Sequence, residues 1–310
     1  MGSFSPSSLF ASLLLLFSNS RSSLSETSYI PKSRAQTSAL PRGDVDLLEF
    51  PLNLEYLEAE FFLWGALGYG LDKEAPALTM GGPPPVGAKK ANLCPFVRDI
   101  ITQFAYQEVG HIRAIQKTVK GFPRPFLDLT ASNFDKIIEN AMGRKLEPPF
   151  DPYANSLNYL IASYIIPYVG LTGYVGANPN LISPQSKRLV AGLLGVESAQ
   201  DAVIRNLLYI KATPRRTLQH HGGRAHRPRL RPPQQARCGS CVKDEGIEEG
   251  AEGKIAGNVI AGDENSLAFD RTPEEILKVV YGGGSASAPG GFFPKGAGGR
   301  IARSFLDKVY

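Results

Sequence analysis

The stretch that decides the fold reads Phe104-Ala-Tyr-Gln-Glu-Val-Gly-His-Ile-Arg-Ala-Ile-Gln116, with apolar residues at helical spacing. Glu108 and His111 are three residues apart, so a helix places both side chains on one face. A carboxylate and an imidazole side by side can bind one metal ion. Most such pairs in proteins are solvated surface pairs, so a metal site here requires partners on other helices.

Other segments also have the periodicity of long helices. Asp44–Trp64 carries Glu55 among leucines, close to its apolar stripe, and Glu58 follows one turn later. A purely structural interpretation puts both glutamates at the solvent edge. Ala154–Gly176 is apolar nearly all round, which predicts a buried helix, and it contains no acidic residue. Pro167 should kink that helix.

The last long helical segment runs from Lys187 to about Lys211. It carries Glu197 and Gln200, which have the same spacing as Glu108 and His111. With the helix predicted from Pro95 to Lys120, the chain has four long helices and no convincing strand alternation. The predicted fold class is therefore all-α, with a four-helix bundle over residues 44–212.

These helices together resemble the ferritin-like superfamily, and the tail resembles the plant desiccation-related proteins within it. The segments that carry the resemblance are Asn53–Glu60, Gln107–His111, Gly195–Asp201, Ala251–Asn258 and Phe292–Gly296. The resemblance implies a secreted or cell-wall stress protein with a ferritin-like bundle.

The resemblance also implies a metal site. A full di-metal site of this family has six protein ligands, of which four map onto Glu55, Glu108, His111 and Glu197. Gln200 replaces an expected His, and the third helix offers no Glu. With two ligands missing, we expect iron or manganese to bind weakly, and a role in binding or structural protection rather than catalysis. The alternative is a metal-dependent oxidase or ferroxidase that uses the same four residues.

The N-terminus predicts secretion. Leu9–Phe17 is an apolar run followed by Ser18-Asn-Ser20, the pattern of a signal peptide over residues 1–20, although no basic residue precedes it. The run is too short to span a bilayer, and we expect no later stretch to be long and apolar enough for stable membrane insertion. Residues 21–43 are rich in Ser, Thr and Arg and indicate a disordered leader. We expect an extracellular protein of the cell wall or apoplast.

Residues 213–241 differ from the rest of the chain. From Pro214 to Cys241 there are seven arginines, no lysine and no acid. Without them the net charge of +5 would become mildly negative, so the charge gives no reason to expect a nucleic-acid partner. Cys238 and Cys241 with the nearby histidines suggest zinc by residue type only. A disordered polyanion-binding segment is a further interpretation. We favour a compensated frameshift, and a segment outside the functional site.

Residues 242–310 resume ordinary composition and form the predicted C-terminal extension. One short helix is predicted there, beginning after Thr272, with Pro273 at its first position and Glu275 completing a capping box. The remainder is glycine-rich and is expected to be irregular. A homo-oligomer is compatible with this organisation, and the sequence specifies no substrate.

Overall fold

The computed structural model describes residues 39–212, 259–263 and 265–306. These residues form helices joined by irregular segments, and they contain two isolated bridges but no β-strand. The prediction of an all-α fold is confirmed. The predicted signal peptide, most of the leader and the segment 213–241 lie outside the described residues.

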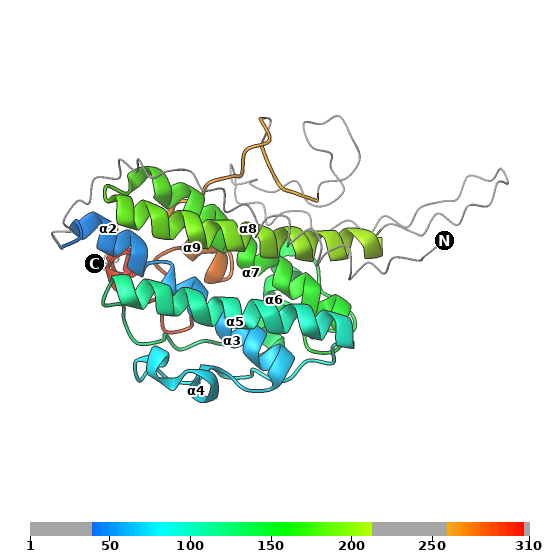
Figure 1. Cartoon of the computed structure of the whole chain (residues 1–310). Coiled ribbons are helices and arrows are strands. Elements are labelled where there is room, and N and C mark those ends of the chain that lie inside the picture. Colours follow the sequence, from blue (N-terminus) through cyan, green and yellow to red (C-terminus); the bar gives the residue numbers. More distant parts are fainter. Residues whose placement is uncertain (1–38, 213–258, 264, 307–310) are drawn as a thin grey trace, which may run out of the picture. The chain divides into compact units, whose positions relative to one another are not determined.

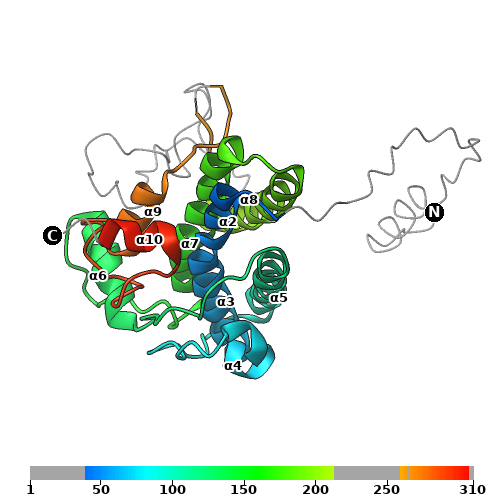
Figure 2. The same cartoon turned by 90° about the vertical axis from the view of Figure 1, so that its left-hand side faces the viewer.

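Four long helices form the bundle. They are α3 (Leu52–Leu67), α5 (Pro95–Thr118), α7 (Ser156–Ala177) and α8 (Pro184–Ala212). The α3 helix packs along α5, and α7 packs along α8, with further contacts between the two pairs. Figures 1 and 2 show the two pairs side by side from perpendicular directions. The bundle therefore encloses an interior to which α3, α5, α7 and α8 can all contribute side chains.

Shorter elements cover the ends and one side of this bundle. They are α2 (Arg42–Glu49), α4 (Leu71–Glu74), η1 (Pro76–Thr79), α6 (Ala131–Met142), η2 (Asn178–Asn180), α9 (Pro273–Val280) and α10 (Gly299–Leu306). Thr130 caps α6 by accepting a hydrogen bond from the backbone N–H of Asn133. The capping box predicted at Thr272 is present at the start of α9.

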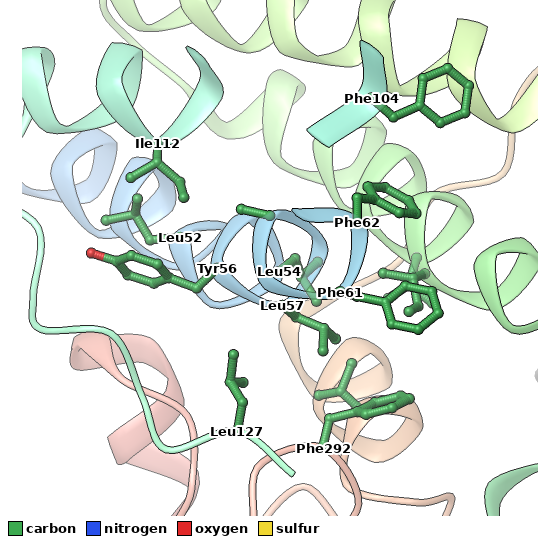
Figure 3. Close-up of a cluster of buried hydrophobic side chains, with 14 of the residues drawn as sticks. Leu52, Leu54, Tyr56, Leu57, Phe61, Phe62, Phe104, Ile112, Leu127 and Phe292 are labelled. Atoms are coloured by element: carbon green, nitrogen blue, oxygen red, sulfur yellow. The ribbon is translucent and has the colours of Figure 1, made fainter. Parts of the chain in front are cut away.

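The α3 helix is the centre of the fold. Of its 16 residues, 14 are buried, because α5, α7 and the C-terminal extension pack around it. Figure 3 shows Leu52 and Phe62 beside side chains of α5, while Leu57 points towards Phe292 of the extension. Phe61 stacks on Tyr159 of α7, with 4.5 Å between the ring centroids. A helix without a solvent-facing side carries every polar side chain in its sequence into the interior. The glutamates of α3 are therefore buried together with its leucines and aromatics.

The prediction of the first helix is wrong in one respect, because two helices occupy the segment that was predicted as one. The sequence predicted one helix over Asp44–Trp64, whereas α2 ends at Glu49 and α3 begins at Leu52. Pro51 causes the break, since it has no N–H to donate within a continuous helix. The α2 helix also begins at Arg42, inside the predicted disordered leader. Asp44 stabilises this position because it accepts hydrogen bonds from the backbone N–H groups of Ile182 and Ser183.

The C-terminal extension contains two helices among the described residues rather than the one predicted, since α10 follows α9. Tertiary contacts hold α10 in place. Asn53 of α3 exchanges two hydrogen bonds with the backbone of Gly298, at 2.7 and 3.0 Å. Arg300 donates to both carboxylate oxygens of Asp46. Eight residues of modest helix propensity are stabilised here by partners more than 240 positions away in the sequence.

The α7 helix is the most apolar element and continues through Pro167. By length and composition, Ser156–Asn180 could cross a membrane, so the expectation that no later stretch is long and apolar enough was wrong. Within the bundle, 61% of its most apolar window is buried. Packing against α3 and α8 accounts for its apolar character.

A buried ion pair joins α3 to the segment before α6. The guanidinium of Arg124 donates to Glu60 and to Asp72, and also to the carbonyls of Pro83 at 2.8 Å and Gly82 at 3.0 Å. Arg124 and Glu60 are both buried. Burial raises the pKa of Glu60, and the guanidinium opposes this rise. The pair is therefore a fully hydrogen-bonded charge pair inside the core.

Arg124→Met should lower the free energy of unfolding by about 3–5 kcal/mol, because it leaves the Glu60 carboxyl group buried without its cation. Urea denaturation followed by circular dichroism measures the loss. Arg113→Met, on the exposed side of α5, is the matched control and should unfold near the wild-type midpoint. Adding Glu60→Gln to Arg124→Met should recover part of the stability. Wild-type stability of the Arg124 variant would contradict this account.

Candidate metal centre

Three helices bring the four predicted site residues into one interior space. Glu55 projects from α3, Glu108 and His111 from α5, and Glu197 from α8, and all four are buried. One ligand atom from each lies within 4.8 Å of the others. Their predicted convergence is therefore present in the structure. That they bind a metal stays a prediction.

The imidazole of His111 lies at the middle of this group. Its Nδ1 is 3.1 Å from Glu55 Oε2, 3.1 Å from Glu108 Oε2 and 3.5 Å from Glu197 Oε1. A single ring N–H cannot donate well to three carboxylates at once. Burial acts to lower the pKa of His111, but the carboxylates of Glu55 and Glu108 outweigh it and raise that pKa. These are ion-pair distances between the imidazole and the carboxylates, and the ligand atoms of the four residues also lie close enough together to surround one cation.

Glu58 also belongs to this space, and sequence reasoning did not include it among the site residues. It is fully buried, and neither of its carboxylate oxygens has a hydrogen-bond partner among the described residues. The same holds for Glu197, although one of its oxygens lies 3.5 Å from His111 Nδ1. We call Glu55, Glu58, Glu108, His111 and Glu197 together the acidic cluster. The available clue was the spacing of Glu58, which lies three residues after Glu55 and therefore on the same face of the helix.

The electrostatics of the acidic cluster leave an excess of negative charge. Burial raises the pKa of Glu58 and Glu197 well above the usual range, and neighbouring carboxylates add to this. Burial also raises the pKa of Glu55 to about 7, although His111 opposes the rise. For Glu108, His111 and hydrogen bonds outweigh burial and lower the pKa. Four buried carboxyl groups share one imidazole, so protons or a metal cation must neutralise the remainder.

Two polar side chains hold the acidic cluster in place. Gln200 Nε2 donates to Glu108 Oε1 at 2.5 Å and to Gln107 Oε1 at 3.0 Å. The hydroxyl of Tyr174, on α7, donates to Glu55 Oε1. Gln200 thus lies beside the site, where a metal-binding histidine is expected. Its amide N–H donates to a carboxylate and orients it. The sequence analysis did not identify Tyr174, because its role depends on contact between α7 and α3.

The acid-free third helix has a specific consequence at Gly170. A Cβ atom at this position of α7 would lie 3.1 Å from Glu197 Oε2 and 3.2 Å from Glu58 Oε1. The two carboxylates therefore occupy the space beneath α7 where a side chain would otherwise project. The prediction that the third helix supplies no acid agrees with α7. Glu58 on α3, however, brings a fourth carboxylate to the interior.

The donor set of the acidic cluster fits a transition-metal ion. Carboxylate oxygens and an imidazole nitrogen suit iron and manganese, whereas the softer thiolate ligands are absent from these five residues. The buried oxygens of Glu58 and Glu197, without hydrogen-bond partners in the described structure, are the atoms that a cation would satisfy. The match between the acidic cluster and a transition-metal ion therefore depends on the ligand types and on the buried carboxylate oxygens, and not on one sequence motif.

A family model described as a ferritin-like domain matches residues 43–210. The chain belongs to the ferritin-like family. This ferritin-like chain is 52% identical to the ferritin-like catalase Nec2 of Nesocodon mauritianus, over 99% of its own length and 100% of that protein. It is 55% identical to the desiccation-related protein PCC13-62 of Craterostigma plantagineum, over 84% of this chain and 85% of that relative. No solved structure matches the chain. The resemblance predicted from the sequence is confirmed.

Glu58→Gln and Glu197→Gln should each reduce iron or manganese binding by this ferritin-like protein without lowering the stability of its metal-free form. Each replacement removes a ligand oxygen, and it also removes a buried carboxyl group that like charges surround. Metal analysis after reconstitution measures the first effect. Thermal unfolding without metal measures the second, and its midpoint should stay the same or rise.

Thermal unfolding with metal provides a further comparison. At a metal concentration about 100 times the dissociation constant, the wild-type protein should gain about 2.7 kcal/mol of stability. Both variants should lose most of that gain. Asp99→Asn, an exposed carboxylate change on α5, is the control and should keep it. Equal metal content in all four proteins would show that Glu58 and Glu197 are not ligands.

Proposed function

We propose that this protein is a metal-dependent enzyme that decomposes hydrogen peroxide, with iron or manganese held by the acidic cluster. The observation that carries the proposal is the convergence of three buried carboxylates on one imidazole. Beside them, the buried oxygens of Glu58 and Glu197 have no hydrogen-bond partner among the described residues. A relative named a catalase, which aligns over 99% of this chain, supports the choice of substrate.

The overall reaction converts two molecules of hydrogen peroxide into two of water and one of dioxygen. One peroxide gives up two electrons and two protons and becomes dioxygen, while the other takes up the same two electrons and two protons as its O–O bond breaks. Redox-active iron or manganese supplies the electron transfer between the two molecules. No further oxidant or reductant is required.

The protein's own residues have distinct parts in this proposal. Glu55, Glu108, His111 and Glu197 would hold and position the metal, and Glu58 would add a further carboxylate ligand. Carboxylate oxygens within the acidic cluster can hold the protons released by one peroxide until the other takes them up. Because the cluster is buried, it also keeps bulk water and larger reductants away from the reacting centre.

Tyr174 and Gln200 keep the ligands in position. Each donates a hydrogen bond to a cluster carboxylate, Tyr174 to Glu55 and Gln200 to Glu108. Donors of this kind fix the orientation of ligand oxygens and commonly change metal affinity or activity when they are removed. They support metal binding by holding the ligand oxygens of Glu55 and Glu108 in position.

A second candidate is the non-catalytic role expected from the sequence. The departures that favour it are Gln200 in place of a histidine and the absence of any acid on α7. The relative named a desiccation-related protein is compatible with such a role. In this case the acidic cluster would hold a metal for storage or structural stability, and peroxide would not be turned over.

Oxygen evolution separates the two candidates. Protein reconstituted with iron or manganese should release dioxygen from hydrogen peroxide, and metal-free protein should not. Tyr174→Phe should lower the activity or the metal affinity by about 10–100-fold, because Glu55 loses its donor. Asp99→Asn is the control and should match the wild type. A fully metal-loaded wild-type protein that evolves no dioxygen would favour the non-catalytic role.

We further propose that the protein acts outside the cell, in the wall or apoplast. The support is the apolar run Leu9–Phe17 followed by small residues, which has the pattern of a cleaved signal peptide. N-terminal sequencing of protein isolated from the tissue that makes it should give a mature chain that begins close after Ser20. Recovery of the intact N-terminus from an intracellular fraction would contradict secretion.

A further inference from the structure

A cavity of about 180 Å³ lies between α2 and α3 on one side and α7 and α9 on the other. Its rim includes the exposed residues Asn180, Asp270 and Thr272. Its inner wall includes Leu54, Gly170 and Tyr174, which are all buried. The lining therefore passes from solvent-exposed residues at the rim to the buried interior of the bundle.

The buried end of this cavity adjoins the acidic cluster. The hydroxyl of Tyr174 donates to Glu55. A Cβ atom at Gly170 would lie within 3.2 Å of carboxylate oxygens of both Glu58 and Glu197. Gly170 lines the cavity and has no side chain, so only its backbone atoms lie between the cavity and these carboxylates. No cluster residue lines the cavity itself, so Gly170 and Tyr174 are the residues that connect it to the cluster. A larger cavity of about 420 Å³, between Glu49 and Arg300, is lined by neither of these two residues.

Small residues of α7 determine how open the cavity is. Gly173 is half-buried, one turn from Gly170 on the same face, and a Cβ atom there would lie 2.7 Å from Cδ1 of Ile276. Even a methyl group at position 173 would therefore press against α9. Leu54 and Ile276 supply apolar surface along the walls. Apolar walls favour a small uncharged molecule over a hydrated ion, which would have to shed its water.

We propose that this cavity is the route by which hydrogen peroxide and other uncharged molecules of similar size reach the metal centre. Gly170 and Gly173 keep the route open, and they set its selectivity against bulkier organic hydroperoxides. The inference rests on the proposed function for the identity of the substrate. The route itself depends only on a metal at the acidic cluster, so the two can be tested separately.

Gly173→Leu is the test variant, because its side chain must project between α7 and Ile276. The matched control is Gly195→Leu, in another long helix of the bundle, where a Cβ atom has no neighbour within 4 Å. Both variants are loaded with iron and their metal content is measured. Nitric oxide, an uncharged diatomic molecule, is then mixed with the ferrous proteins, and its association rate is followed by stopped-flow absorbance.

Gly173→Leu should slow nitric oxide association and lower kcat/KM for hydrogen peroxide, each by about tenfold or more, at unchanged metal content. Gly195→Leu should leave both at the wild-type value. Wild-type rates in a metal-loaded Gly173→Leu protein would overturn the route. Slowed nitric oxide association in a protein whose wild type never decomposes peroxide would support the route and reject the proposed function.

A second measurement applies if Gly173→Leu does not fold. Wild-type protein should turn over hydrogen peroxide at least about 100 times faster than tert-butyl hydroperoxide, because the bulkier substrate does not fit the passage. Gly173→Ala, a smaller obstruction, should slow nitric oxide by less than the leucine variant would. Equal turnover of the two peroxides, or an unchanged rate in Gly173→Ala, would overturn the selectivity and the route respectively.

Discussion

The constraint on which the rest of the structure depends is the burial of α3, in which 14 of 16 residues are buried. Helices and loops pack on every side of it, so its glutamates have no solvent-facing position to occupy. A carboxyl group in such a place is costly unless another group compensates its charge or its lost hydration. The helices α5, α7 and α8 and the segment around Arg124 supply the groups that compensate these buried carboxylates.

The partners of the buried glutamates differ along α3. The partner of Glu60 contributes to stability, whereas the surroundings of Glu55 and Glu58 indicate a functional site. Glu60 is paired with the guanidinium of Arg124, which is buried against it, also contacts Asp72 and is itself fully hydrogen-bonded. Within the acidic cluster, Glu55, Glu108 and Glu197 share the imidazole of His111. Neither carboxylate oxygen of Glu58 has a hydrogen-bond partner among the described residues. Groups left short of partners inside a folded protein often mark a functional site, because they reduce stability without a ligand. This contrast within one helix is the strongest structural argument for a cation at the cluster.

The α7 helix contributes no acidic residue to the site, and it has glycines at positions 170 and 173, on one face of the helix. It presents Gly170 to the carboxylates and Gly173 to α9, so no side chain of α7 covers the acidic cluster at Gly170. Tyr174 is the exception, as its hydroxyl reaches across to Glu55. A helix that provides a donor and an opening, instead of a ligand, is compatible with a centre that small molecules must reach. The same apolar composition gives α7 the hydropathy of a membrane span, although its burial is that of a core helix.

The sequence by itself determined the elements that depend on local periodicity and local chemistry. Helical spacing was sufficient for the four long helices, and the three-residue spacing of Glu108 and His111 was sufficient to place both on one face. The tertiary structure alone decided that Glu58 faces Glu197, that Gln200 donates to Glu108, that Tyr174 reaches Glu55, and that Asn53 and Asp46 hold a second helix in the tail. Those outcomes depend on distances between side chains far apart in the chain, which one-dimensional periodicity does not contain. Periodicity gives the face of a helix on which a residue lies, but only packing decides what stands opposite that face.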